Sequence, residues 1–388
     1  MAFRFIHTAD WHLGRLFHTV SLLEDQAHAL AQLRDLIRAA RADALIVAGD
    51  VYDRAVPPAD AVRLLDETLA AIVGGLGVPV AMIAGNHDSP ERLGFGSALL
   101  AARGLHVRGP LTANLEPVRL GDADGPIHLY PLPYAEPALV RERLGDPHAH
   151  SHDAAMAATL ARIDAARSGA RSIAIAHCFV AGGRACESER PLSVGGAGHV
   201  EVGRFAGFDY VALGHLHRAQ RVGKSAGIEG HYAGSLLKYA FSESDHIKSV
   251  NLVEMDATGA CRVERIRLSP RRDLRILEGR LAELLNGPAP GESRDDYLLV
   301  RLLDKEALLD PMGKLRMVYP NLLHLERPGL LESGTLVGAA RERLGRTEQS
   351  LFASFFEQIV GDPLSPDQGA ALAAVLESLS RAERESAA

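Results

Sequence analysis

Five short segments place carboxylate, amide or imidazole side chains where a run of apolar residues ends. In chain order they carry Asp10 and His12, Asp50, Asn86 and His87, His177, and finally His215 and His217. A dinuclear site for phosphoester cleavage needs a carboxylate that bridges two cations, neutral ligands beside it, and open positions for water and substrate. These residue types supply that inventory, and a set without thiolates suits manganese or iron at least as well as zinc. The pattern therefore predicts a two-metal phosphoesterase.

The candidate residues divide into metal ligands and groups that act beside the metals. Asp50 is the natural bridging ligand because it follows Gly49, which permits close approach of the backbone. His87 is the candidate general acid that protonates the leaving alkoxide, and Asp53 could hold the His87 ring in position. The predicted metal ligands are Asp10, His12, Asp50, Asn86, His177, His215 and His217.

Each of these residues also has an ordinary structural explanation. An Asp at a strand end is usually a turn or cap residue, and a lone histidine is more often a satisfied surface or core residue. We assign no site role to His28, His106, His128, His199 and His324, and we place His148, His150 and His152 in a solvated loop. The five segments differ because D-x-H, G-D-x-x-D, G-N-H-D, a lone His and G-H-x-H all follow predicted strands, and such clustering indicates a site.

The elements that must position these side chains alternate between strands and helices along the first two thirds of the chain. Apolar residues at helical spacing predict helices over Leu22–Arg41 and Pro58–Val73. Alternating elements predict an α/β layered domain, in which ligands bind outside the carboxyl ends of the strands. The predicted strands cover Phe3–Thr8, Ala44–Ala48, Val78–Ala84, Ser172–Ala176 and Tyr210–Leu213.

The rest of the chain changes character twice. From Glu229 to Leu268 the pattern is dominated by strands, and a segment rich in Arg, Pro and Gly follows, so we place a domain boundary near Ser269. A smaller unit with a strand at Tyr297–Leu302 comes next, and the chain then becomes helical. A capping box at Ser365 begins the last helix. The predicted domains are 1–268, 269–335 and 336–388.

Bulk properties limit the class of protein. The 388 residues are 47% hydrophobic, which predicts a globular chain, and no apolar run is long enough to span a membrane. We expect a cytoplasmic protein that needs no membrane, since the N-terminal apolar run is too short for a secretory signal. Three cysteines without a CxxC pair argue against disulfides and a thiolate zinc site. A net charge of −7 argues against nucleic acid, but a local basic surface or a metal site can still supply positive charge at a phosphate.

One basic stretch has two explanations that the sequence leaves open. Its arginines either follow a phosphate backbone or form a solvated face, because charge alone defines no groove. They are Arg262, Arg265, Arg267, Arg271, Arg272 and Arg275.

The motifs resemble those of the calcineurin-like metallophosphoesterase superfamily and, within it, the SbcD family of bacterial nuclease subunits. SERPLSVGG and GSLLKYAFSE are typical of that family rather than of the superfamily at large. The resemblance extends over essentially the whole chain, through His7–Gly14, Gly85–Pro90, Phe179–Gly183, Ser188–Gly196, Gly234–Glu243, Asp295–Tyr297, Asp310–Met312, Tyr319–Asn321 and Leu351–Gly361.

The resemblance implies a ligand set, a fold and a set of partners. Asp10, His12, Asp50 and His217 would hold one manganese ion, and Asp50, Asn86, His177 and His215 the other, while His87 acts without holding metal. The implied fold is a β-sandwich flanked by helices, with a smaller α+β capping domain and C-terminal helices. The implied partners are DNA and SbcC, an SMC-like ATPase, with a nuclease homodimer inside a heterotetramer.

Three functions remain as hypotheses. The leading one is a metal-dependent nuclease in DNA double-strand-break repair, a 3′-5′ double-strand exonuclease and a single-strand and hairpin endonuclease that works with its ATPase. The second is a small-molecule phosphodiesterase or a phosphatase of the same superfamily. Such an enzyme would need neither the smaller domain nor the Phe-rich C-terminal helix, which carries Leu351, Phe352, Phe355, Phe356 and Ile359. The third is a DNA-end scaffold without catalysis, which the complete ligand set opposes.

Overall fold

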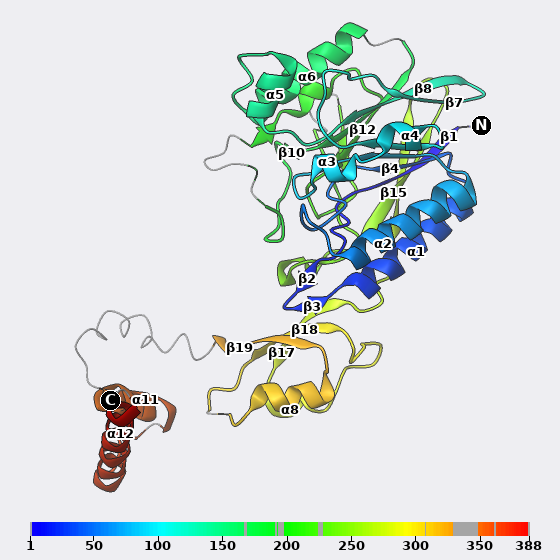
Figure 1. Ribbon diagram of the computed structural model, residues 1–388. Helices are drawn as coiled ribbons and strands as arrows, with labels where there is room; N and C mark the ends of the chain where they lie inside the picture. The colour runs from blue at the N-terminus through cyan, green and yellow to red at the C-terminus, as the bar shows by residue number, and fades with distance from the viewer. Residues whose placement is uncertain are drawn as a thin grey trace. The chain divides into compact units, whose positions relative to one another are not determined.

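The chain divides into two compact units, Met1–Leu274 and Arg275–Ala388. The computed structural model describes residues 2–166, 169–190, 192, 198–223, 228–306, 308–328, 348–360 and 362–386. Figure 1 shows the elements in chain order from blue to red.

The first unit contains two six-stranded sheets. In the first sheet β1, β4, β5 and β6 run parallel, and β15 and β16 add an antiparallel pair beside β1. The order across this sheet is β16 (Cys261–Arg267), β15 (Ser249–Met255), β1 (Phe3–Thr8), β4 (Ala44–Val47), β5 (Val80–Ile83) and β6 (Leu105–Arg108). Helices α1 (Leu23–Ala40) and α2 (Ala59–Leu69) connect its parallel strands and lie side by side (Figure 1).

The second sheet has a parallel centre and two antiparallel edges. Strands β14, β12, β9 and β8 are parallel to one another, while β13 pairs antiparallel with β14 at one edge and β7 with β8 at the other. The order is β13 (Gln220–Val222), β14 (Gly230–Tyr232), β12 (Tyr210–Gly214), β9 (Arg171–His177), β8 (Gly125–Leu132) and β7 (Val118–Asp122). The connection from β8 to β9 carries α5 (Pro137–Leu144) and α6 (His152–Ala166).

The two sheets pack face to face, and alternate residues of each strand explain how. Ile46 and Ile83 of the first sheet share one core with Ile173 of the second. Ala174, next to Ile173, points to the opposite face and joins a second core that includes Leu160 of α6. Since successive side chains of a strand point to opposite faces, the second sheet is buried on both sides. The predicted β-sandwich flanked by helices is confirmed.

The predicted strand ends come from both sheets rather than from one open sheet. β1, β4 and β5 belong to the first sheet, and β9 and β12 to the second. The strands predicted between Glu229 and Leu268 complete the sandwich, since β14 joins the second sheet and β15 and β16 join the first.

Shorter elements connect these strands. They are β2 (Leu16–Phe17), β3 (Val20–Ser21), a π-helical turn at Ala70–Gly75, α3 (Pro90–Leu93), α4 (Ser97–Ala101), β10 (Phe179–Val180), β11 (His199–Val200), and 3₁₀ turns at Val202–Phe205 and Phe241–Glu243.

The second unit has a three-stranded sheet with its own core. Buried Leu298, Val300 and Leu302 of the central strand pack with Leu315. Its elements are β17 (Leu274–Gly279), α7 (Leu281–Leu284), β18 (Tyr297–Leu302), α8 (Pro311–Val318), β19 (Leu322–Glu326), α11 (Glu348–Val360) and α12 (Pro366–Ser386).

The C-terminal helices carry one confirmed prediction. Ser365 and Gln368 form the capping box, since each side chain accepts a hydrogen bond from the main-chain N–H of the other. The predicted boundary at residues 335 and 336 lies outside the described residues. Among the described residues, no helix combines the length and apolar composition needed to cross a bilayer.

Candidate metal centre

Four of the seven predicted ligands adopt backbone conformations that are rare for residues other than glycine. The φ angles are 54° at Asp10, 47° at His12, 49° at Asp50 and 102° at His215. Left-handed backbone at such residues costs free energy and persists where the surroundings enforce it, most often at functional sites. The strand ends are therefore bent to direct these side chains toward one place.

Two glycines allow the sheets to approach each other at this place. A Cβ atom at Gly49 would lie 2.4 Å from Nδ1 of His177, and one at Gly214 would lie 1.9 Å from the carbonyl oxygen of Ala48. Both distances are too short for any side chain, so glycine before Asp50 and before His215 is a steric requirement.

The first group of ligand atoms surrounds Asn86. Its Oδ1 lies 2.9 Å from Nε2 of His177 and 3.2 Å from Nδ1 of His215. The Nδ1–H of His177 donates to the carbonyl oxygen of Ala48 over 2.9 Å, so in the neutral ring the lone pair is on Nε2. Asp50 Oδ2 lies 3.5 Å from the same Nε2. Asp50, Asn86, His177 and His215 thus converge.

The second group consists of Asp10, His12 and His217, whose ligand atoms lie within 4.8 Å of one another. Asp10 Oδ1 accepts from the main-chain N–H of His215 over 2.9 Å. Asp10 Oδ2 is buried and has no hydrogen-bond partner among the described residues. Such an atom is costly unless a cation or water satisfies it.

Asp50 stands between the two groups. Its Oδ1 accepts from the main-chain N–H of His87 over 2.9 Å. Its Oδ2 is then directed at the imidazoles, 3.6 Å from Nε2 of His12 and 3.5 Å from Nε2 of His177. Although burial disfavours its charge, His177 and His12 hold the pKa of Asp50 well below its usual value. An ionised carboxylate between two ligand groups is what a bridging position requires.

The donor set fits divalent cations. Burial lowers the pKa of His12 and of His217, and lowers that of His215 to about 3, so all three rings are neutral at pH 7. Neutral imidazoles and charged carboxylates are the forms that bind metal. Burial also raises the pKa of Asp10 well above its usual value, which shows the cost of this carboxylate without a cation. The residues therefore suit two cations.

His87 lies at the edge of the centre with one ring nitrogen anchored. Its Nδ1–H donates to the carbonyl oxygen of Asp53 over 2.8 Å, and its Nε2 lies 3.9 Å from Asp50 Oδ2. The main chain of Asp53 makes this contact. The Asp53 carboxylate instead accepts from Arg15 over 3.1 Å and lies 3.7 Å from Nδ1 of His12.

Sequence reasoning missed the residues that hold the ligand loops. The Asp88 carboxylate accepts from the main-chain N–H groups of Val51, Tyr52 and Gly85, and so ties the loops of Asp50 and Asn86 together. Burial raises the pKa of Asp88 to about 6. The position of Asp88 directly after Asn86 and His87 in the sequence could have indicated that it supports the site. The other residues that support these loops are the buried Gln26, Ser188, Tyr239, Glu243 and Lys248 and the partly buried Glu189.

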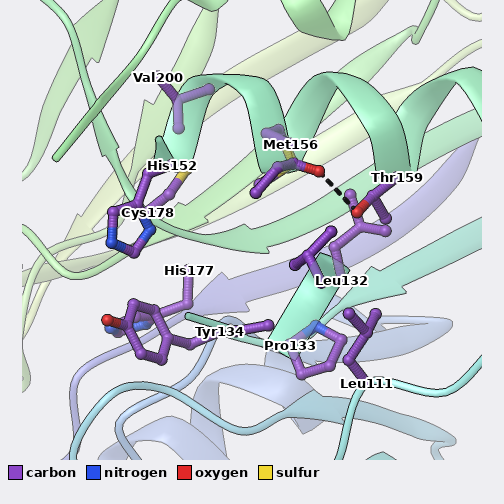
Figure 2. Close-up of a pocket in the computed structure, with 13 residues that line it drawn as sticks. Leu111, Leu132, Pro133, Tyr134, His152, Met156, Thr159, His177, Cys178 and Val200 are labelled. Atoms are coloured by element: carbon purple, nitrogen blue, oxygen red, sulfur yellow. Dashed lines mark hydrogen bonds between the residues drawn. The ribbon is translucent and has the colours of Figure 1, made fainter. Parts of the chain in front are cut away.

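The prediction for the histidine-rich loop is correct at two positions and wrong at the third. His148 and His150 are exposed. His152 begins α6 and is 7% exposed, because its ring stacks on Tyr134. Tyr134 also meets the ring of His177, a predicted ligand, edge-on, and Figure 2 shows all three residues among those that line one pocket. The five histidines that received no role remain at least partly exposed.

The arginine stretch is partly neutralised by carboxylates. Arg271 and Arg272 pair with Glu24 at the start of α1. Arg275 pairs with Glu292 and Asp296 inside the second unit. Arg262, Arg265 and Arg267 stand on the edge strand β16, exposed to solvent.

Comparison with known proteins agrees with this geometry. Residues 3–219 match the calcineurin-like phosphoesterase family, and residues 270–359 match a family described as the type 5 capsule protein repressor C-terminal domain. The SbcD subunit of the nuclease SbcCD from Staphylococcus epidermidis is 30% identical over 366 residues, which cover 94% of this chain and 96% of the relative. The chain belongs to the SbcD family of calcineurin-like phosphoesterases.

Membership of the SbcD family makes the chain a metal-dependent phosphodiester hydrolase of the nuclease-subunit type, and the described residues include His and Asp clusters that could hold divalent metals. Among solved structures, a dimetal phosphatase from Danio rerio is similar at 15% identity with a TM-score of 0.42, over 69% of this chain and 99% of that one.

Proposed function

We propose that this chain is the nuclease subunit of a DNA double-strand-break repair complex. In this role it hydrolyses DNA phosphodiesters as a 3′-5′ double-strand exonuclease and as a single-strand and hairpin endonuclease. The observation that carries the proposal is the position of Asp50 Oδ2, 3.6 Å from Nε2 of His12 and 3.5 Å from Nε2 of His177. The relative over nearly the whole chain is named a nuclease subunit.

The ligand assignment follows the two groups of atoms. Asp10, His12, Asp50 and His217 would hold one cation, and Asp50, Asn86, His177 and His215 the other. We assign manganese to both positions, because imidazole and carboxylate ligands without thiolates suit it at least as well as zinc and the family resemblance implies it. Bound at this place, the two cations would supply a nucleophile at neutral pH and stabilise charge on the phosphate.

His87 would donate the proton that the reaction requires. Water attacks phosphorus and loses a proton to solvent, the bond from phosphorus to the leaving oxygen breaks, and that oxygen takes a proton from Nε2 of His87. The hydrogen bond from Nδ1 to the Asp53 carbonyl keeps Nε2 directed at the centre, 3.9 Å from Asp50 Oδ2. The Nδ1–H group donates to this carbonyl oxygen whether or not Nε2 carries a proton, so the ring keeps its direction when Nε2 gives its proton away.

The partners follow from the family and from exposed apolar residues. An SbcC-type SMC-like ATPase would bind the C-terminal helices, where Phe352 of α11 is 45% exposed. A second copy of this chain would cover Phe95 and Leu99, which are 86% and 82% exposed in the segment after the His87 loop. Large apolar side chains that are exposed and close together indicate contact surfaces. Two such copies with two ATPase chains make the proposed heterotetramer.

A nuclease assay distinguishes the three hypotheses. The purified chain is incubated with manganese and circular single-stranded DNA, and in parallel with a small phosphodiester such as bis-p-nitrophenyl phosphate. Cleavage of the circle supports the nuclease. Hydrolysis of the small ester alone would indicate the small-molecule enzyme, and binding of DNA without cleavage would indicate the scaffold.

A further inference from the structure

His217 is held at three polar groups by buried or partly buried side chains from outside the ligand motifs. Its main-chain N–H donates to Glu189 Oε1 over 2.6 Å, and its carbonyl oxygen accepts from Lys248 Nζ over 2.9 Å. Its ring Nδ1 lies 2.7 Å from Ser188 Oγ. Nε2 is then the ring atom that faces the centre, 3.0 Å from Nε2 of His12.

The proton of the Ser188 hydroxyl decides the tautomer of His217. Ser188 donates to Glu243 Oε1 over 2.5 Å. A hydroxyl has one proton, so toward His217 the Ser188 oxygen can only accept. Nδ1 of His217 therefore carries the proton, and its lone pair is on Nε2. That is the form in which Nε2 can bind a cation.

Glu243 is itself fixed in place. It is fully buried, and Oε2 accepts from Lys248 Nζ over 2.5 Å. Lys248 also donates to Ser235 Oγ over 2.8 Å and to the carbonyl oxygen of His217, so its three protons are used. Buried ion pairs contribute little net stability because desolvation offsets the attraction. The desolvation cost of the Glu243–Lys248 pair is better explained by the orientation that the pair imposes on His217.

Two family motifs gain a function from these contacts. SERPLSVGG begins at Ser188 and continues with Glu189, and GSLLKYAFSE runs from Gly234 to Glu243. None of their residues belongs to the predicted ligand set. Ser188 nevertheless contacts His217, which lies 29 residues later in the sequence, and Glu243, which lies 55 residues later. The two motifs thus converge on one ligand.

We propose that Ser188, supported by Glu243 and Lys248, is a positioning residue that fixes the tautomer and direction of His217. Its loss weakens one of the two cation sites, the one that includes Asp10, His12 and His217. The other site, around Asn86 and His177, has separate anchors and keeps its affinity. The inference rests on the proposed two-cation function and deepens it.

The test is a titration of the metal-free full-length chain with Mn²⁺ by calorimetry, with thermal unfolding of the same samples. Ser188→Ala removes the acceptor of His217 Nδ1–H with little change in volume. Loss of such a ligand-orienting partner typically costs about 10- to 100-fold in metal affinity. We expect that loss for one of two Mn²⁺ ions, while the second binds as in the unmodified chain.

Two further variants separate positioning from general damage. Ser188→Thr keeps the hydroxyl and is expected to bind both ions within a few-fold of the unmodified chain. Ser172→Ala removes another buried hydroxyl, at the far end of β9, and should bind both ions normally. Normal binding of both ions by Ser188→Ala would overturn the inference, and so would equal weakening of both ions with a lower unfolding temperature. Failure of the unmodified chain to bind any Mn²⁺ would instead contradict the proposed function itself.

Discussion

The Nε2 atoms of His12 and His217 lie 3.0 Å apart, although one residue follows a strand of the first sheet and the other a strand of the second. Burial lowers the pKa of both rings, so both are neutral at pH 7. Two neutral nitrogens at this distance share one proton in the absence of metal. A cation between the sheets would accept both lone pairs, and this contact would then link sheet packing to metal binding.

Asp50→Ala should disturb both cations, whereas His12→Ala should mainly weaken one. The reason is that Asp50 Oδ2 is close to imidazoles of both ligand groups, while His12 belongs to one proposed ligand group, with Asp10 and His217. Metal content after dialysis against a fixed concentration of free Mn²⁺ checks the difference. Equal metal content in the two variants would contradict the bridging position of Asp50.

His87→Ala should abolish most activity without emptying the metal site. Loss of a general acid typically lowers the rate by about 100- to 10,000-fold. The ring has a main-chain anchor and lies 3.9 Å from Asp50 Oδ2, so its removal leaves the ligands in place. Elemental analysis should find near-normal manganese beside strongly reduced cleavage of single-stranded DNA. Metal occupancy that collapses together with activity would show that His87 is a ligand.

Metal binding should release protons, with a pH dependence set by His177. Although burial opposes its protonation, Asp50 and Asp10 raise the pKa of this ring to about 9 in the metal-free protein. A cation needs the neutral ring, so Mn²⁺ affinity should rise with pH up to about 9 and then level off. Calorimetry at pH 7.5 in buffers of different ionisation enthalpy should detect proton release.

The raised pKa of His177 also predicts how the stability of the metal-free protein depends on pH. A folded-state pKa above the unfolded value of about 6.5 adds stability that is fully present below pH 6.5 and disappears as pH rises through about 9. Thermal unfolding of the metal-free chain between pH 6 and pH 9.5 measures this loss. A pH-independent Mn²⁺ affinity over that range would contradict the predicted protonation of His177.

Chelation should abolish activity, and Mn²⁺ should restore it better than Mg²⁺. Magnesium prefers oxygen ligands and keeps several waters, whereas the predicted set contains four imidazoles, His12, His177, His215 and His217. Initial rates after chelation, dialysis and addition of each ion test the preference. Full activity in Mg²⁺ alone would count against a histidine-rich site.

The parts of this fold that the sequence predicts are those with a local signature. An apolar run that ends in Asp, Asn or His identifies β1, β4, β5, β9 and β12 directly. β8 escaped prediction because Pro126, His128 and Pro131 interrupt its apolar pattern. Division of the strands into two sheets is set by long-range pairing, such as that of β1 with β15, which no local pattern reveals.

The predicted site residues were recognisable because metal ligands are chemically distinctive at strand ends. Ser188, Glu243 and Lys248 are ordinary polar residues in sequence and become significant only because they satisfy one another when buried. His152 illustrates the same limit, since its burial depends on stacking against Tyr134, which lies 18 positions earlier. Mutual burial of distant residues is a property of the folded chain, and sequence spacing does not show it.

Removal of the C-terminal helices should separate nuclease chemistry from partner binding. A chain that ends at Gly345 keeps every predicted metal ligand and lacks α11 and α12. These helices contact one another, which an ordinary terminal hairpin would also do. Phe352 and Val375, however, remain 45% and 54% exposed, so their mutual packing leaves apolar surface for another molecule. Aromatic side chains on a helix are frequent anchors of helix-in-groove contacts.

The truncated chain should still cut circular single-stranded DNA with Mn²⁺, and it should lose stable association with the SMC-like ATPase. ATP-stimulated attack on duplex ends should disappear with that association.

Phe352→Glu in the full-length chain tests the surface without a deletion, and Glu357→Ala on the same helix is the matched exposed control. Co-purification with the ATPase is measured for all four chains beside both cleavage assays. Because Phe352 is exposed, its replacement by Glu should leave folding and single-strand cutting intact while weakening co-purification. Undiminished binding of the ATPase by the truncated chain would place the partner contact elsewhere on the protein.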